Sequence, residues 1–154
     1  LLSYAFIGLF YMIQPSAAEG SRQQAEIIIP EEWKETYEKW GFAPAIRTGD
    51  YLHLSGVIVR AEGDGTDEEK YAAGFKLTLA RIENILKEAG ASLDDVIEMT
   101  TYHTELMGQI NTAVQVRKEV MKKPYSTWTA VGTTALADPR GLTEIKVMAY
   151  VGQK

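Results

Sequence analysis

The sequence predicts an α+β fold, in which a mixed sheet carries two long helices on one of its faces. Strand and helix patterns follow one another in the order β, short α, β-β, α, β, α, β-β. Two segments, residues 66–90 and 107–123, have the length and apolar periodicity of sheet-covering helices. The strand segments alternate apolar and polar side chains, as half-buried strands do. Together these patterns indicate one α+β domain.

The composition limits the kind of protein and the kind of partner. The chain has 154 residues, of which 45% are hydrophobic and 24% charged, as expected for one globular domain with a sizeable core. The net charge is -5 and no long Lys/Arg cluster is present, which argues against binding nucleic acid or anionic lipid. There is no cysteine and there are two histidines, so we expect no disulfide, no metal site and no cofactor.

The first 18 residues have the pattern of a secretory signal peptide. An apolar run over residues 1–13 is followed by Gln14-Pro15 and then by the small residues Ser16-Ala17-Ala18. The run is short for a membrane span, so we expect cleavage near Ala18, no permanent anchor, and a periplasmic or secreted domain over residues 19–154. The alternative is that this segment forms an apolar strand or helix of the mature fold.

The next segments predict a short strand and an aromatic helix. The stretch AEIIIP reads as a strand that ends at Pro30. In EEWKETYEKWGF, Trp33, Tyr37 and Trp40 recur at the spacing of one helical face. Such a stripe is most often core packing, and the alternative is a lid over a pocket.

A hairpin and the best-marked helix follow. The turn signal Thr48-Gly49-Asp50 separates two strand segments, and the second of these places Leu52 and Leu54 on one face. In the helix after it, Thr66 and Glu69 form a capping box and Gly90 supplies the C-terminal stop. The apolar stripe of this helix comprises Phe75, Leu79, Ile82 and Leu86.

The remaining elements are a strand, a helix and two strands. VIEMTTYHTEL is rich in β-branched and aromatic residues, which predicts a strand. The helix over residues 107–123 has one face made of Ile110, Ala113, Val114, Arg117, Val120 and Met121. STWTAVGTTAL and LTEIKVMAYV then read as strands on either side of the turn ADPRG. Alternation alone does not say whether Trp128, in the first of these strands, is a core residue or the floor of a binding site.

These segments, in this order and spacing, resemble the RidA (YjgF/YER057c/UK114) family over roughly residues 25–151. The similarity is carried by FAPAIRTGDYLHLSG, ILKEAGASLDDVIEMTTYHTEL, INTAVQVRKEV, TWTAVGTTAL and LTEIKVMAYV. The resemblance implies a chorismate-mutase-like fold that assembles as a homotrimer. It also implies a small-molecule cleft between subunits, where active members hydrolyse imines or enamines.

The resemblance assigns roles to seven positions. The family's water-orienting glutamate matches Glu144, its serine matches Ser55 beside Gly56, and its asparagine matches Asn111. Three positions depart from the family pattern. Ala45 stands for a tyrosine, Ala130 for a cysteine, and Trp128 for the arginine that holds the substrate carboxylate.

The departures leave two functions open. An indole offers one N–H donor and no charge, so Trp128 does not replace a bidentate arginine. It either stacks on a flat, apolar or cationic ligand or fills the vacated space. Glu144 is either a general base or a solvated or paired carboxylate. We therefore expect a small-molecule-binding trimer with weak or lost deaminase activity, and the alternative is an imine or enamine deaminase that uses Glu144.

Overall fold

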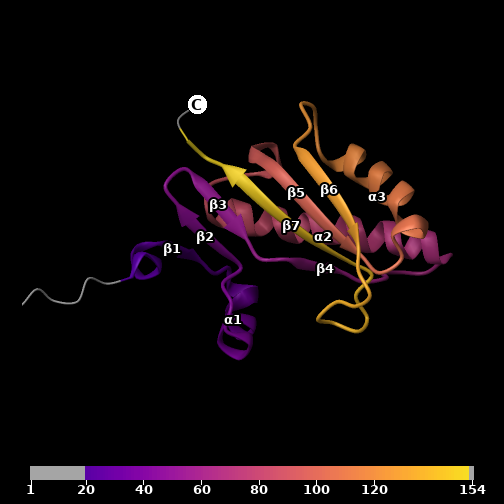
Figure 1. Cartoon of the computed structure of the whole chain (residues 1–154), viewed down its shortest axis with the longest axis horizontal. Helices are drawn as coiled ribbons and strands as arrows, with labels where there is room; N and C mark the ends of the chain where they lie inside the picture. Colours follow the sequence, from indigo (N-terminus) through magenta and orange to yellow (C-terminus); the bar gives the residue numbers. More distant parts are fainter. Residues whose placement is uncertain (1–19, 153–154) are drawn as a thin grey trace, which may run out of the picture.

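The computed structural model describes residues 20–152 and contains the predicted order of strands and helices, except that the second strand of the predicted hairpin is divided into two strands at Ser55-Gly56 (Figure 1). Short 3-10 turns over Ser21–Gln24, Glu31–Trp33 and Leu93–Asp95 join some of the elements. The elements are β1 (Glu26–Ile28), α1 (Lys34–Trp40), β2 (Ala45–Thr48), β3 (Tyr51–Leu54), β4 (Val57–Val59), α2 (Asp67–Glu88), β5 (Val96–His103), α3 (Leu106–Val120), β6 (Thr127–Gly132) and β7 (Thr143–Tyr150).

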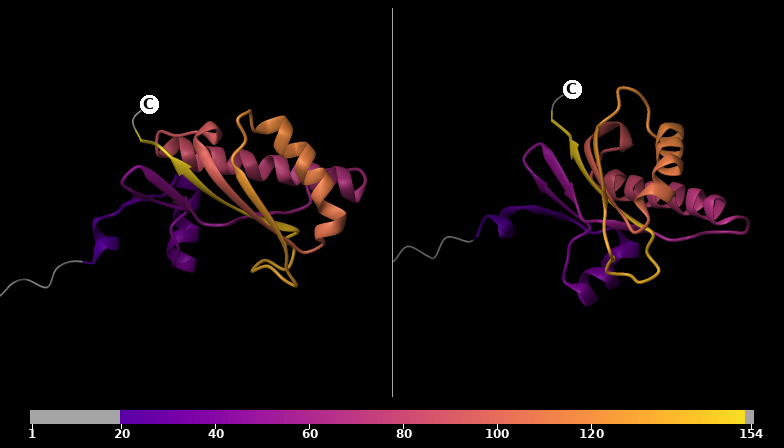
Figure 2. Two further views of the ribbon diagram at one scale, coloured as in Figure 1. Left: turned by 45° about the horizontal axis from the view of Figure 1, so that its top comes forward. Right: turned by 45° about the vertical axis from the view of Figure 1, so that its right-hand side comes forward.

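The strands form one seven-stranded mixed sheet in the order β1-β2-β3-β7-β5-β6, and β4 also pairs with β7. Strands β5 and β6 run parallel, and the other pairs are antiparallel. Helices α2 and α3 pack against each other on one face of the sheet, while α1 lies apart from both, below the sheet in Figure 1 (Figures 1 and 2). The predicted α+β architecture is confirmed.

Helix α2 has the start, the stop and the buried stripe that the sequence predicts. The Thr66 hydroxyl accepts from the Glu69 backbone N–H, and the Glu69 carboxylate accepts from the Thr66 N–H. Gly90 has φ +74°, the left-handed conformation that favours glycine. The four predicted stripe residues are fully buried: Phe75, Leu79, Ile82 and Leu86.

The buried face of α3 is rotated from the predicted one. The prediction is confirmed for the buried residues Ala113, Arg117 and Met121, whereas Ile110, Val114 and Val120 are only half-buried. The structure buries Gln109, Thr112 and Val116 in their place. Helix α3 contacts α2 as well as β5 and β6, so its buried surface is broader than an apolar stripe, and polar side chains that find hydrogen bonds lie within it.

The register of the central strands defines the two faces of the sheet. One row, Val147–Met99–Trp128, faces the helices, and its two apolar members on β7 and β5 belong to the core. The row Glu144–Tyr102–Val131, three positions further along β5, faces the other way, because successive side chains alternate across a strand. This second face carries exposed apolar side chains of β3, β5, β6 and β7: Tyr51, Tyr102, Val131 and Tyr150. We call it the open face.

Among residues 20–152, no helix has the length and apolarity needed to cross a lipid bilayer. The signal peptide expected over residues 1–18 lies outside the described residues and stays a prediction.

Candidate small-molecule pocket

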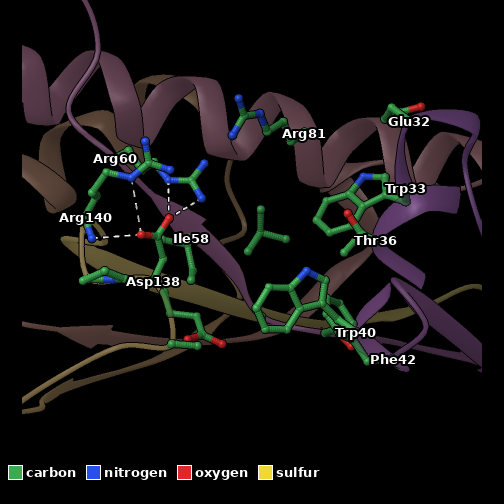
Figure 3. A pocket seen from close by; sticks show the side chains of 16 residues that line it. Glu32, Trp33, Thr36, Trp40, Phe42, Ile58, Arg60, Arg81, Asp138 and Arg140 are labelled. Atoms are coloured by element: carbon green, nitrogen blue, oxygen red, sulfur yellow. Dashed lines mark hydrogen bonds and ion pairs between the residues drawn. The ribbon is translucent and has the colours of Figure 1, made fainter. Parts of the chain in front are cut away.

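A cavity of about 830 Å³ lies where α1, β4, α2 and the loop before β7 meet. Its lining includes three of the residues that the sequence assigns to a site, Ser55, Gly56 and Glu144. Aromatic side chains of the α1 region and three arginines complete it: Arg60 directly after β4, Arg81 on α2 and Arg140 in the loop. Figure 3 shows the aromatic rings on one side of the pocket and an arginine cluster on the other.

Glu144 reaches this pocket from β7, where it is registered against Ile58 on β4 and Tyr102 on β5. Its carboxylate lies directly beside Gly56, because a Cβ built on Gly56 would stand 1.8 Å from Glu144 Oε1. No Lys or Arg of the described chain forms an ion pair with Glu144. The pocket therefore holds a half-buried carboxylate that is available to a ligand or to a water molecule.

Ser55 shapes the backbone beside this carboxylate. Its hydroxyl donates to the Ala43 carbonyl at 2.7 Å, and its backbone N–H donates to the Pro44 carbonyl at 2.9 Å. These bonds tie the link between β3 and β4 to the segment that precedes β2. The Ser55 side chain thus uses its donor within the fold and offers a ligand only its remaining acceptor capacity.

The arginine cluster is organised by Asp138. Arg60 Nε donates to Asp138 Oδ2 at 2.6 Å, and a second Arg60 nitrogen pairs with the same oxygen. The backbone N–H of Arg140 donates to Asp138 Oδ1 at 2.9 Å, and its Nε lies 3.6 Å from that oxygen. The Arg140 backbone bond, followed by the Arg60 side-chain bond, lowers the pKa of Asp138, so this carboxylate stays ionised.

Arg81 lines the pocket from α2 and differs from the two arginines around Asp138. Within residues 20–152 it forms no ion pair with an Asp or Glu. It is half-buried, and Figure 3 shows it on the helix side, between the cluster and the aromatic rings. Its guanidinium is the unneutralised cation of the pocket.

The aromatic side is formed by Trp33, Trp40 and Phe42 (Figure 3). Trp33 is half-buried and packs against the core, as an aromatic stripe usually does. Trp40 is 67% exposed, so core packing is the wrong prediction for this residue. Tyr37, the third residue of the stripe, is half-buried and is not among the pocket residues. The end of α1 thus belongs to a pocket wall, whereas the alternative predicted from the sequence was a lid over a pocket.

The other four predicted site residues lie elsewhere in the chain. Ala45 is 1% exposed and belongs to the core. Asn111 is exposed on α3. Trp128 and Ala130 are on β6, on the face that carries the helices, whereas Glu144 is on the open face. Within one subunit the structure therefore brings together Ser55, Gly56 and Glu144, and it separates them from these four.

Trp128 is held by two side chains. Its indole Nε1 donates to Thr101 Oγ1 at 2.9 Å, and the Arg117 guanidinium carbon lies 5.1 Å from the ring centroid. Arg117 is 7% exposed and also lies over Tyr125 at 5.4 Å, and it donates to the Ser126 carbonyl and hydroxyl at 3.1 Å each. Burial lowers the pKa of Arg117, although nearby Tyr125 opposes this shift. The position where the resemblance places an arginine thus has a buried guanidinium supplied by α3.

Thr101 connects Trp128 to a buried polar network. Its hydroxyl lies 2.8 Å from His103 Nε2, and His103 Nδ1 lies 3.1 Å from Thr143 Oγ1. Tyr71 completes the network at 2.8 Å from Thr143, and burial raises its pKa to about 12. Burial also lowers the pKa of His103, which favours the neutral imidazole.

Sequence patterns missed the arginine cluster and the free cation Arg81. Arg140 lies in the turn ADPRG, Arg60 directly follows a strand, and Arg81 lies between the apolar residues of a helix, positions where solvated arginines are common. The close approach of α2 to β4 brings them together. A Cβ on Gly74 would stand 1.7 Å from the Arg60 carbonyl oxygen, so the glycine permits this contact. In the sequence, the glycine at residue 74 is the one sign of this close approach between α2 and β4.

The described residues contain no cluster of three or more His, Cys, Asp or Glu side chains that would hold a metal ion. The pocket offers organic recognition groups: indole faces, guanidinium forks and the carboxylates of Glu32 and Glu144, which form no ion pair in the described chain.

Comparison with known proteins agrees with this fold. A family model described as Endoribonuclease L-PSP matches residues 35–151. The RutC family protein YjgH of Escherichia coli K12 is 34% identical over 129 residues, which covers 82% of this chain and 95% of that relative. A solved structure of Protein YJGH has a TM-score of 0.70 at 33% identity and covers 84% of this chain and 98% of that one.

A second solved structure, Rv2704 from Mycobacterium tuberculosis, is described as a member of the YjgF/YER057c/UK114 family. It has a TM-score of 0.69 at 28% identity, with 82% of this chain and 99% of that chain covered. The matched segment contains the whole pocket except two residues of the turn that precedes α1, Glu32 and Trp33. The agreement of sequence, family model and fold shows that this chain belongs to the Endoribonuclease L-PSP family of RidA/YjgF proteins.

Proposed function

We propose that this protein binds a small organic molecule in the pocket around Glu144, and that the imine hydrolysis of active family members is weak or lost. The observation that carries the proposal is that Glu144, Ser55 and Gly56 line one cavity, while the arginine of the family pattern is replaced by Trp128. The Trp128 N–H is used by Thr101, and the Arg117 guanidinium lies over its ring. Trp128 therefore offers no donor to a substrate carboxylate.

We further propose that the protein is a homotrimer whose subunits cover the open face. Tyr51, Tyr102, Val131 and Tyr150 are each 37–42% exposed on that face, and an exposed apolar surface of this kind is typical of an interface. The Glu144 row of β7 lies on the same face, so an adjacent subunit would border the pocket. Light scattering on the domain over residues 19–154 tests this assembly, and a monomer at micromolar concentration would contradict it.

The test of binding is a fragment screen by NMR on the labelled domain. We expect hits that shift the amide resonances of Gly56 and of β4, because these amides lie beside the Glu144 carboxylate. Glu144→Gln preserves side-chain size and removes the charge, so it should change the affinity of those hits. The control is Glu88→Gln, at the far end of α2 and outside the pocket. A screen whose hits leave Gly56 and β4 unshifted would contradict the proposal.

The second candidate function is imine or enamine hydrolysis with water activated by Glu144. It is favoured by one observation, that the Glu144 carboxylate faces a cavity and has no cation partner in the described chain. The measurement is ammonia release from amino-acid-derived imines generated in the assay. Activity that Glu144→Ala abolishes would establish this function, and activity that survives Glu144→Ala would exclude this mechanism.

A further inference from the structure

We infer that the ligand of this pocket is an aromatic carboxylate, whose acid group binds at Arg81 and whose ring lies against Trp40 and Trp33. This inference rests on the proposed function, since it names the class of molecule that the Glu144 pocket takes. It is carried by three observations on the described residues: the charge balance at one end, the exposed indole at the other, and the distribution of the acidic side chains.

The charge balance calls for an anion at the arginine end. Arg60, Arg81 and Arg140 contribute three positive charges to the pocket, and Asp138, Glu32 and Glu144 contribute three negative ones. Of these carboxylates only Asp138 forms an ion pair with an arginine of the described chain, and its partners are Arg60 and Arg140, so Arg81 is left unpaired. Both carboxylate oxygens of Asp138 already accept hydrogen bonds, one from Arg60 and the other from the Arg140 N–H. Its side chain is only 14% exposed, so it does not serve Arg81 as well. A ligand carboxylate would give Arg81 an ion-pair partner, and the planar guanidinium of Arg81 matches a carboxylate in a bidentate geometry.

The opposite end of the pocket suits a flat apolar group of a ligand. Trp40 is the most exposed of the large aromatic side chains on the described surface, at 67%, and Trp33 beside it is half-buried. Both line the cavity, and Figure 3 shows their rings across the pocket from the Arg60–Asp138–Arg140 cluster. An aromatic ring bound here would remove apolar surface of both partners from water and would stack or pack edge to face on the indoles.

The acidic residues of the pocket set the orientation of the ligand. Glu32 lies on the Trp33 side, away from the arginine cluster (Figure 3), and Glu144 lies beside Gly56. A ligand carboxylate near either of them would meet a like charge, whereas at Arg81 it meets an unpaired cation. The acid therefore points to α2 and the ring to α1.

Calorimetric titration with three matched probes tests this assignment: phenylacetate, phenylacetamide and acetate. We expect phenylacetate to bind about tenfold or more tightly than phenylacetamide, since a hydrogen bond to a charged group is stronger than a neutral one. Acetate, which lacks the ring, should bind much more weakly than phenylacetate. Arg81→Gln should abolish the preference for the acid over the amide, and Trp40→Leu should weaken both aromatic probes equally.

Arg47→Gln is the matched control, because Arg47 lies outside the pocket and pairs with Glu26 at 3.4 Å. It should leave all three affinities unchanged. Equal binding of acid and amide, or an acid preference that survives Arg81→Gln, would overturn the carboxylate assignment while the pocket itself stands. Failure of all three probes to bind would overturn the aromatic-carboxylate class, and the fragment screen on Gly56 and β4 would then decide separately whether the pocket binds other molecules.

Discussion

The Glu144 carboxylate occupies the space beside Gly56 that a β-carbon would fill, with Oε1 1.8 Å from that position. The pair joins two segments that are distant in sequence, the link between β3 and β4 and the last strand. Gly56 has no positive φ, so its role here is to give room to the carboxylate.

Gly56→Ala should displace the Glu144 carboxylate with little loss of stability. The clash involves the flexible end of a side chain, which can rotate away, so we expect the free energy of unfolding to change by less than about 1 kcal/mol. Binding of fragments that contact Glu144 should weaken at least tenfold. The control is Gly132→Ala on β6, where the added carbon would meet Leu106 at an ordinary 3.7 Å. Unchanged affinity in Gly56→Ala would show that the carboxylate position does not matter for binding.

Gly74→Ala should destabilise the fold, although alanine favours helices by about 1 kcal/mol over glycine. Its Cβ would stand 1.7 Å from the Arg60 carbonyl oxygen, and a backbone atom does not rotate away. We expect a net loss of about 1–3 kcal/mol in urea unfolding, the range for overpacked positions. Gly108→Ala in α3, where a Cβ meets no atom within 4 Å, should not destabilise. A stabilised Gly74→Ala variant would mean that α2 does not pack this closely on β4.

The free energy of unfolding should fall as the solution is acidified below about pH 6.5. Burial lowers the pKa of His103 in the folded chain, so the unfolded chain binds the proton more readily. The stability that neutral His103 contributes is complete above the ordinary imidazole value of about 6.5, and it is lost as the pH falls toward the folded pKa.

The measurement for His103 is urea unfolding between pH 5 and pH 8, compared with His103→Gln. Titration of this one group changes the free energy of unfolding by at most about 1.4 kcal/mol per pH unit. The His103→Gln variant should lack this contribution to the pH dependence. His53→Gln is the control, because His53 is exposed and its variant leaves the buried network intact. A wild-type profile identical in shape to that of His103→Gln would contradict the prediction.

Trp128→Phe should cost about 1–2 kcal/mol of unfolding free energy. The substitution removes the N–H donor to Thr101 and reduces the attraction of the aromatic face for Arg117. Trp40→Phe is the matched control: its indole is 67% exposed, and its replacement should change stability by less than about 0.5 kcal/mol. Equal effects of the two substitutions would show that Trp128 is not held as the structure indicates.

Much of the architecture was predictable because the information is local. The capping box of Thr66 and Glu69, the stop at Gly90 and the apolar stripe from Phe75 to Leu86 act within one helix, and all of them appear in the structure. The β-branched and aromatic residues of β5 and the alternation of β7 likewise predict strands whatever their neighbours. The order of these elements also carried the family resemblance, which the comparisons confirm.

The sequence by itself thus determined the elements, their order and the family, and it identified Glu144, Ser55 and Gly56 as candidates. The tertiary structure decided which of these side chains share a surface. The register of β5, β6 and β7 puts Trp128 on the helix side and Glu144 on the open face, and the approach of α2 to β4 brings Arg81 toward Arg60 and Asp138. These are contacts between segments far apart in the chain, and they depend on strand register and helix packing, which local periodicity does not encode.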